Sequence, residues 1–162
     1  MTHVPFIKPP SKLRFGRLTN PVIFLGGSID QGVTEDWQDK VTTKYSNDKL
    51  TFLNPRRDDW DQNADESGIR EQIYWELDGL EGADAIIIYF HPESKAPISL
   101  LELGLFARAH KVVVVCPTGY WRKTNVDVVC ARYGIAITED LDDGMQKAIQ
   151  IAMQNYMGSS HE

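Results

Sequence analysis

The chain has 162 residues, of which 42% are hydrophobic and 25% are charged, and its formal net charge is -6. That length fits one domain that buries a full hydrophobic core, and the composition excludes a disordered or fibrous protein. The first twenty residues hold four basic side chains and no acid, which leaves about -10 for the rest and argues against a nucleic-acid polymer as partner.

The sequence also bears on the cell compartment and on metals. No apolar run approaches the length of about eighteen residues that spans a membrane, and the N-terminal segment lacks the apolar core of a signal peptide. We therefore expect a cytoplasmic protein with no membrane partner. Cys116 and Cys130 form no CxxC pair, which predicts reduced thiols. The four histidines show no metal-ligand spacing, and we predict no metal site.

Residues 1–20 are predicted to form an extended N-terminal arm, because Pro5, Pro9 and Pro10 disfavour a helix or an inner strand. From Pro21 onward, short apolar runs alternate with helical patterns. Five strands are expected, at residues 22–25, 50–53, 85–90, 112–115 and 135–137. Continuous apolar runs such as the fourth are typical of parallel strands that are covered on both faces.

This alternation of strands and helices predicts an α/β fold. We expect a single doubly wound, flavodoxin- or Rossmann-like, mostly parallel five-stranded sheet with helices on both faces. The domain is expected to span residues 21–157, and residues 158–162 form a C-terminal tail.

Ligands of such sheets bind outside the carboxyl ends of the strands, where the strand order reverses. This rule selects four loops, at residues 26–30, 54–68, 91–97 and 117–125. The first holds Gly26, Gly27 and Ser28, and the second holds Trp60. The glycines let a ligand approach the backbone closely, although a plain tight turn explains them equally well. Trp60 is either a stacking platform for a planar ligand or part of a solvated loop.

Glu102 is the most unusual residue of the chain, because it is a carboxylate within the apolar helical run 97–107. Burying an unpaired carboxylate costs several kcal/mol or forces it to take up a proton. A sequence that keeps one there is expected to use it. The alternative is a structural ion pair with Arg56, Arg57 or Arg70.

Glu76 is the second candidate for chemistry. It is either a solvated flank of its helix or an acid that acts with Glu102, and it borders a predicted apolar stripe made of Ile69, Ile73, Leu77 and Leu80. The sequence has no GxSxG elbow and no credible Cys/His pair, which leaves carboxylate chemistry. A Glu nucleophile can attack an anomeric carbon and form a covalent glycosyl-enzyme, while a second acid protonates the departing group.

Three motifs together resemble the nucleoside 2-deoxyribosyltransferase family over roughly residues 22–130. They are Phe24-Leu25-Gly26-Gly27-Ser28, Glu76-Leu77 followed by Ala83-Asp84-Ala85-Ile86, and Leu101-Glu102-Leu103-Gly104. The resemblance implies transfer of 2-deoxyribose between nucleobases with retention, through an ester on Glu102 and without a cofactor. The partners that it implies are small-molecule nucleosides and nucleobases.

The resemblance also implies roles for single residues. Glu76 falls where the family has an Asp that contacts the base, and Asn125 matches an Asn that reaches the sugar 5′-hydroxyl in a neighbouring subunit's site. Shared sites of this kind imply a homo-oligomer built from dimers. Phe24 replaces a Tyr that touches the nucleophile in several members. Ala96, together with Asp30, favours a free nucleoside over a 5′-monophosphate as substrate.

Two other functions fit the same residues. A 2′-deoxynucleoside or nucleotide N-glycosidase, which is a hydrolase, would use water in place of the second base. A nucleotide-binding or signalling module of the same fold would bind its ligand without turnover. The three functions differ in whether a new nucleoside, a free sugar or no product is formed.

Overall fold

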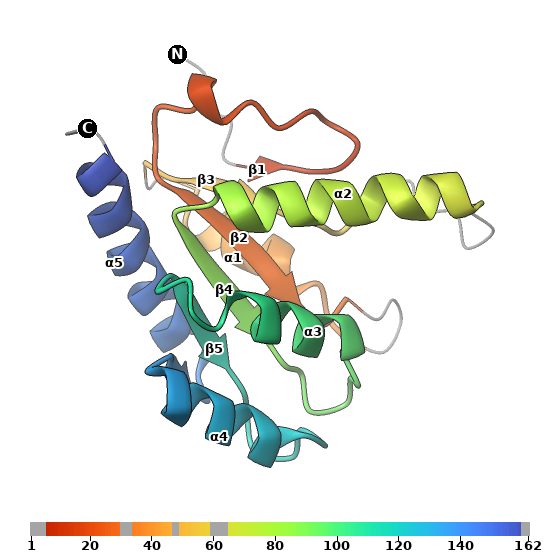
Figure 1. Cartoon of the computed structure of the whole chain (residues 1–162), viewed down its shortest axis with the longest axis vertical. Helices are drawn as coiled ribbons and strands as arrows, with labels where there is room; N and C mark the ends of the chain where they lie inside the picture. The colour runs from red at the N-terminus through yellow and green to blue at the C-terminus, as the bar shows by residue number, and fades with distance from the viewer. Residues whose placement is uncertain (1–5, 30–33, 47–48, 59–64, 160–162) are drawn as a thin grey trace.

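The fold is described from a computed structural model, for residues 6–29, 34–46, 49–58 and 65–159. A parallel sheet lies between two layers of helices, as Figure 1 shows. The strands are β1 (Phe6–Ile7), β2 (Val22–Gly27), β3 (Thr51–Leu53), β4 (Ala85–Tyr89), β5 (Val112–Val115) and β6 (Ala136–Thr138). The helices are α1 (Trp37–Lys44), α2 (Glu66–Gly82), α3 (Pro97–Phe106), α4 (Lys123–Tyr133) and α5 (Leu141–Ser159), with a 3₁₀ turn, η1, at Phe15–Arg17.

The sheet has the strand order β1-β3-β2-β4-β5-β6, and every neighbouring pair is parallel. The doubly wound α/β fold predicted from the sequence is therefore confirmed. The predicted number of five strands is wrong by one, because the sheet has an additional strand, β1, at its edge. β1 is parallel to β3, with Phe6 beside Phe52 and Ile7 beside Leu53. A strand of two residues is too short to show an alternating or continuous apolar pattern, so the sequence gives no sign of it.

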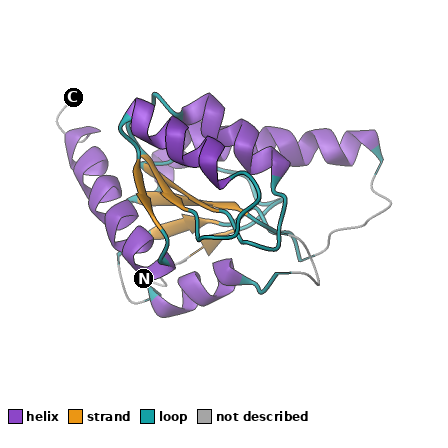
Figure 2. Ribbon diagram, turned by 90° about the horizontal axis from the view of Figure 1, so that it is seen from below, coloured by secondary structure: helices purple, strands orange, loops and turns teal. Residues whose placement is uncertain are grey.

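Two hydrophobic cores fill the spaces on either side of the sheet. Alternate residues of the central strands point to opposite faces, so Phe24 and Ile86 pack under α2, α3 and α4, while Leu25 and Ile87 pack under α1 and α5. Figure 2 shows the strands enclosed by these helices. Burial on both faces explains why β4 and β5 are apolar throughout.

The buried side of α2 differs from the prediction. Ile69 and Ile73 were expected to face the core, yet they are 43% and 47% exposed. The buried residues of α2 are Gln72, Trp75, Gly79 and Leu80. Gln72 and Trp75, on either side of Ile73 in the sequence, are buried, so the two isoleucines lie on a different side of α2 from the one that packs on the rest of the chain. Figure 1 shows the N-terminal end of this helix extending past the sheet. A polar side chain, Gln72, thus occupies a buried position of the helix.

Candidate active site

A cavity of about 180 Å³ lies at the carboxyl ends of β2, β3 and β4. Four segments form its wall: the end of β2, the loop after β3, the middle of α2 and the first turns of α3. The lining residues are Gly26, Gly27, Ser28, Ile29, Pro55, Glu76, Ala96, Pro97, Ile98, Ser99 and Glu102. Five residues singled out from the sequence, namely Gly26, Gly27, Ser28, Glu76 and Glu102, thus come together in one place.

The turn after β2 has a fixed shape that only glycine permits. Gly27 has a φ of 127°, and a Cβ at this position would lie 2.2 Å from the carbonyl oxygen of Tyr89. The following residue, Ser28, is buried and bonded on three sides. Its amide donates to Tyr89 O, its Oγ accepts from the amide of His91, and its carbonyl accepts from Trp37 Nε1. These bonds hold the floor of the cavity in one conformation.

Glu102 lies in the middle of α3 and is only 8% exposed. Within the described ranges, its carboxylate has no hydrogen bond and no ion pair. Burial, and then the negative charge of Glu76, raise the pKa of Glu102 to about 8. The structural alternative is not seen for two of the three arginines, because Arg56 pairs with Asp36 and Arg70 pairs with Glu66.

The large apolar side chains of the run 97–107 that flank Glu102 are mostly exposed. Ile98 and Leu105, its neighbours on the helix surface, are each 59% exposed, and Leu101 is exposed as well. These side chains lie on the outer face of α3, while Glu102 and Ser99 face inward to the cavity. Glu102 is therefore buried on the side of α3 that faces the end of β2 and α2, while Ile98, Leu101 and Leu105 are left open to solvent.

Glu76 faces the same cavity from α2 and is half-buried. Burial raises its pKa, and a hydrogen bond from Gln72 Nε2 to Glu76 Oε1, 2.8 Å long, acts in the opposite direction. The description of Glu76 as a solvated flank of its helix does not fit this position. Two carboxyl groups with raised pKa values in one small cavity are a typical arrangement for acid, base and nucleophilic chemistry.

Asn125, another predicted ligand contact, lies away from this cavity. Asn125 is exposed on α4, in a separate cavity of about 300 Å³ between α3 and α4 that Leu100, Leu103 and Val129 also line. Trp60 and Asp30 fall outside the described residues. Phe24 is fully buried in the core beside Trp75, with ring centroids 6.4 Å apart.

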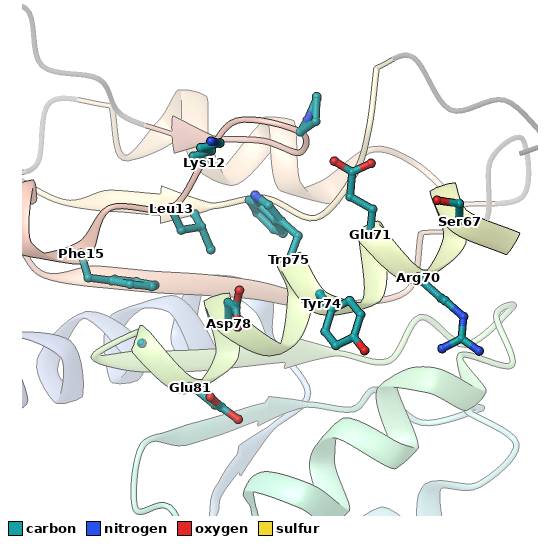
Figure 3. Close-up of a pocket in the computed structure, with 12 residues that line it drawn as sticks. Lys12, Leu13, Phe15, Ser67, Arg70, Glu71, Tyr74, Trp75, Asp78 and Glu81 are labelled. Carbon is teal, nitrogen blue, oxygen red and sulfur yellow. The ribbon is translucent and has the colours of Figure 1, made fainter. Parts of the chain in front are cut away.

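A larger groove, of about 890 Å³, lies on another side of α2 and holds neither Glu76 nor Glu102. Figure 3 shows Phe15 at one end and Arg70 at the other, with Tyr74 and Trp75 between them. Acidic side chains from α2 line it together with Lys12. Among the described residues, the smaller cavity is the better candidate site for chemistry, because two buried carboxyl groups meet there.

Two neighbours of Glu76 were not anticipated from the sequence. Gln72 lies one helical turn before Glu76, and Pro55 belongs to the loop after β3. The spacing of four residues between Gln72 and Glu76 is a signal that a sequence search could have used, since side chains at i and i+4 meet on a helix. The rule for carboxyl ends selects the loop that contains Pro55, but nothing in the sequence singles out this residue.

The described residues contain no group of three or more His, Cys, Asp or Glu side chains arranged to hold a metal ion. No described helix is both long enough and apolar enough to cross a bilayer.

Comparison with known proteins adds one match. A family model described as "Nucleoside 2-deoxyribosyltransferase like" matches residues 20–120, a range that includes every residue lining the small cavity. The comparison with curated proteins gave no match.

Proposed function

Because the chain belongs to the nucleoside 2-deoxyribosyltransferase-like family, we propose that it transfers 2-deoxyribose from one nucleobase to another. The observation that supports this most directly is Glu102, a buried carboxylate without a partner among the described residues, which lines a small cavity together with Glu76. A nucleophile of this kind is poorly solvated and therefore reactive toward an electrophilic carbon once it is ionised.

The proposed reaction has two steps. In the first, a Glu102 oxygen bonds to C1′ of the deoxynucleoside, the electron pair of the C1′–N bond goes to the leaving base, and Glu76 gives that base its proton. In the second, a new base attacks C1′, the ester oxygen leaves as the Glu102 carboxylate, and Glu76 takes up the proton of the incoming base. Two displacements at one carbon give net retention, and no cofactor enters either step.

The pair of carboxyl groups supplies the proton that these steps need. The pKa of Glu102 is raised to about 8 and that of Glu76 is raised by burial. Two such groups do not readily ionise together, so near neutral pH the pair keeps one proton. The productive form has Glu102 ionised and the proton on Glu76, and it has the same net charge as the form with the proton exchanged.

We propose further that a second copy of this chain covers the outer face of α3. Ile98, Leu101 and Leu105 form an exposed apolar row on this helix, and Ile98 is also at the rim of the cavity. Exposed apolar surface of this kind is typical of an interface. In this arrangement, Asn125 of each copy reaches the cavity of its neighbour, which is consistent with its position outside the cavity of its own chain.

The test is product analysis by chromatography. The protein is incubated with deoxyinosine or thymidine plus adenine, and formation of deoxyadenosine is measured. Glu102→Gln should lower transfer by at least about 10³-fold, while Glu71→Gln, at an exposed position of α2, serves as the matched control and should leave it unchanged.

The alternative outcomes identify the other functions. Full transfer by Glu102→Gln would contradict the role of Glu102. Release of base without a new nucleoside would indicate an N-glycosidase, and tight binding of a nucleoside without any turnover would indicate a binding module.

A further inference from the structure

Gln72 connects two residues of the cavity wall, Pro55 and Glu76. Its side chain is 8% exposed, and its Nε2 donates two hydrogen bonds: one to Glu76 Oε1 at 2.8 Å and one to the carbonyl oxygen of Pro55 at 3.0 Å. Pro55 and Glu76 both line the cavity. One amide group therefore ties α2 to the loop after β3 at the place where Glu76 faces Glu102.

The orientation of this amide follows from its partners. A backbone carbonyl oxygen can only accept a hydrogen bond, so the group that faces Pro55 O must be the NH₂ end of the amide. The same NH₂ group faces Glu76 Oε1, so that oxygen must accept and cannot bear a proton in this bond. When Glu76 is protonated, the proton is consequently on Oε2.

We infer that Gln72 is a positioning residue. It fixes the carboxyl group of Glu76 and keeps the proton that Glu76 transfers on the Oε2 atom of that group. This inference rests on the proposed function for the transfer step. The state of the Glu76 carboxyl group itself is a property of the protein alone, and it can be measured without turnover.

Stability does not explain the presence of Gln72. Its Oε1 is buried and has no hydrogen-bond partner within the described part of the chain, and an unsatisfied buried acceptor is destabilising. Methionine has a similar length and no polar atom that needs a partner. A core position selected for stability alone would favour such a side chain, so the amide is better explained by its two donated bonds.

The loop that Gln72 contacts is fixed from its other side as well. Asn54 Oδ1 accepts a hydrogen bond from the amide of Arg56, and the Arg56 guanidinium bonds to Gln38 Oε1 and to Asp36. Pro55 lies between these two residues. The carbonyl that holds Gln72 thus belongs to an anchored segment, which makes it a firm reference point for Glu76.

The hydrogen bond from Gln72 has a consequence for the pH dependence of the reaction. It stabilises the ionised form of Glu76 and lowers the pKa of that residue, against the effect of burial. Among the described residues, Glu102 on α3 is the titratable group that faces Glu76. The loop after β3 presents the uncharged carbonyl of Pro55, and the end of β2 presents Gly26, Gly27 and Ser28. Removal of the donor should therefore move proton loss from the pair to higher pH.

The test compares Gln72→Met with the parent and with Gln146→Met, the same substitution at an exposed glutamine of α5 on the opposite face. For Gln72→Met we expect kcat to fall by about 10²-fold, with KM for the deoxynucleoside within about threefold of the parent. The acid limb of the kcat profile should move to higher pH. The melting temperature should stay within about 4 °C of the parent. The control should match the parent in all four.

A second measurement separates this inference from the proposed function. Carbon-13 NMR follows the Glu76 carboxyl carbon, assigned by its loss in Glu76→Gln, through a pH titration of the parent and of Gln72→Met. A shift of the titration to higher pH in the variant supports the role of Gln72 even if no substrate is turned over. Identical titrations, or an unchanged kcat profile in an active enzyme, would overturn it.

A folding defect in Gln72→Met would not end the test. Gln72→Asn keeps an amide at this position but is one methylene too short to reach both acceptors. It should show the same changes in smaller degree. A normal kcat profile and a normal Glu76 titration in this variant would again contradict the inference.

Discussion

Replacing Glu102 by glutamine should change how the stability of the protein depends on pH. Burial and the charge of Glu76 raise the pKa of Glu102 from 4.5 to about 8 in the folded state. The folded protein thus binds this proton more tightly than the unfolded chain does. Stability from this source is complete below the unfolded pKa, and it is lost as pH rises to the folded pKa.

The size of the effect follows from the two pKa values. At 1.36 kcal/mol for each pH unit, the interval from 4.5 to about 8 corresponds to about 5 kcal/mol of unfolding free energy. Glutamine has nearly the same shape and does not titrate. Each end of the range from pH 4.5 to pH 8.5 lies within a titration, so the unfolding free energy of Glu102→Gln should rise relative to that of the parent by about 4 kcal/mol across this range. Glu76→Gln should reduce the difference between the folded and unfolded pKa values of Glu102, because the Glu76 charge contributes to the raised pKa of Glu102.

The assay is urea unfolding at fixed protein concentration, at several pH values between 4.5 and 9, with unfolding free energies from linear extrapolation. Glu71→Gln is the matched control, since Glu71 is exposed on α2. Its difference from the parent should be small and constant over this range. A constant difference for Glu102→Gln as well would refute the reasoning, because it would show that Glu102 has an ordinary pKa in the folded protein.

Two other substitutions test the turn after β2 and the shared site. Gly27→Ala should lower the unfolding free energy by about 2–4 kcal/mol, because its Cβ would meet Tyr89 O at 2.2 Å and its φ is 127°. Gly104→Ala has open space at its Cβ and should raise the unfolding free energy by about 0.5–1 kcal/mol. Equal losses for the two variants in thermal melts would contradict this account. Asn125→Ala and Glu102→Gln should each be inactive alone, yet a mixture of the two variants that exchanges subunits should recover about one quarter of the parental transfer activity. A mixture without activity would show that Asn125 does not serve a neighbour's site.

Much of the fold could be predicted because its strands are buried on both faces. The runs at Ala85–Tyr89 and Val112–Val115 are apolar throughout, and few structures other than a covered parallel sheet produce such a pattern. The rule for carboxyl ends then placed Gly26, Gly27 and Ser28 at the correct edge of the sheet. β1 and the buried side of α2 escaped prediction for a common reason. Each depends on which part of the chain lies beside it, and local hydropathy does not contain that information.

A residue of the cavity is conspicuous in its own segment only when its chemistry does not suit that segment. Glu102 is such a residue, since a carboxylate in an apolar helix is anomalous at the level of sequence. Gln72 is not, because glutamine is ordinary in a helix. Its importance appears only when the fold places the carbonyl of Pro55, 17 positions earlier, within hydrogen-bond distance.

The two-residue strand β1 has a practical consequence for anyone who shortens this protein. The family match covers residues 20–120 and leaves out β1, although β1 pairs with β3 at the margin of the sheet. A fragment cut to the family boundaries would present the free amides and carbonyls of β3, whose three side chains are all buried in the full chain, as an open template for another chain. It would also lose α5 and the cover that this helix gives to β4 and β5. Such a fragment is expected to aggregate, so expression should keep the residues on both sides of the family match.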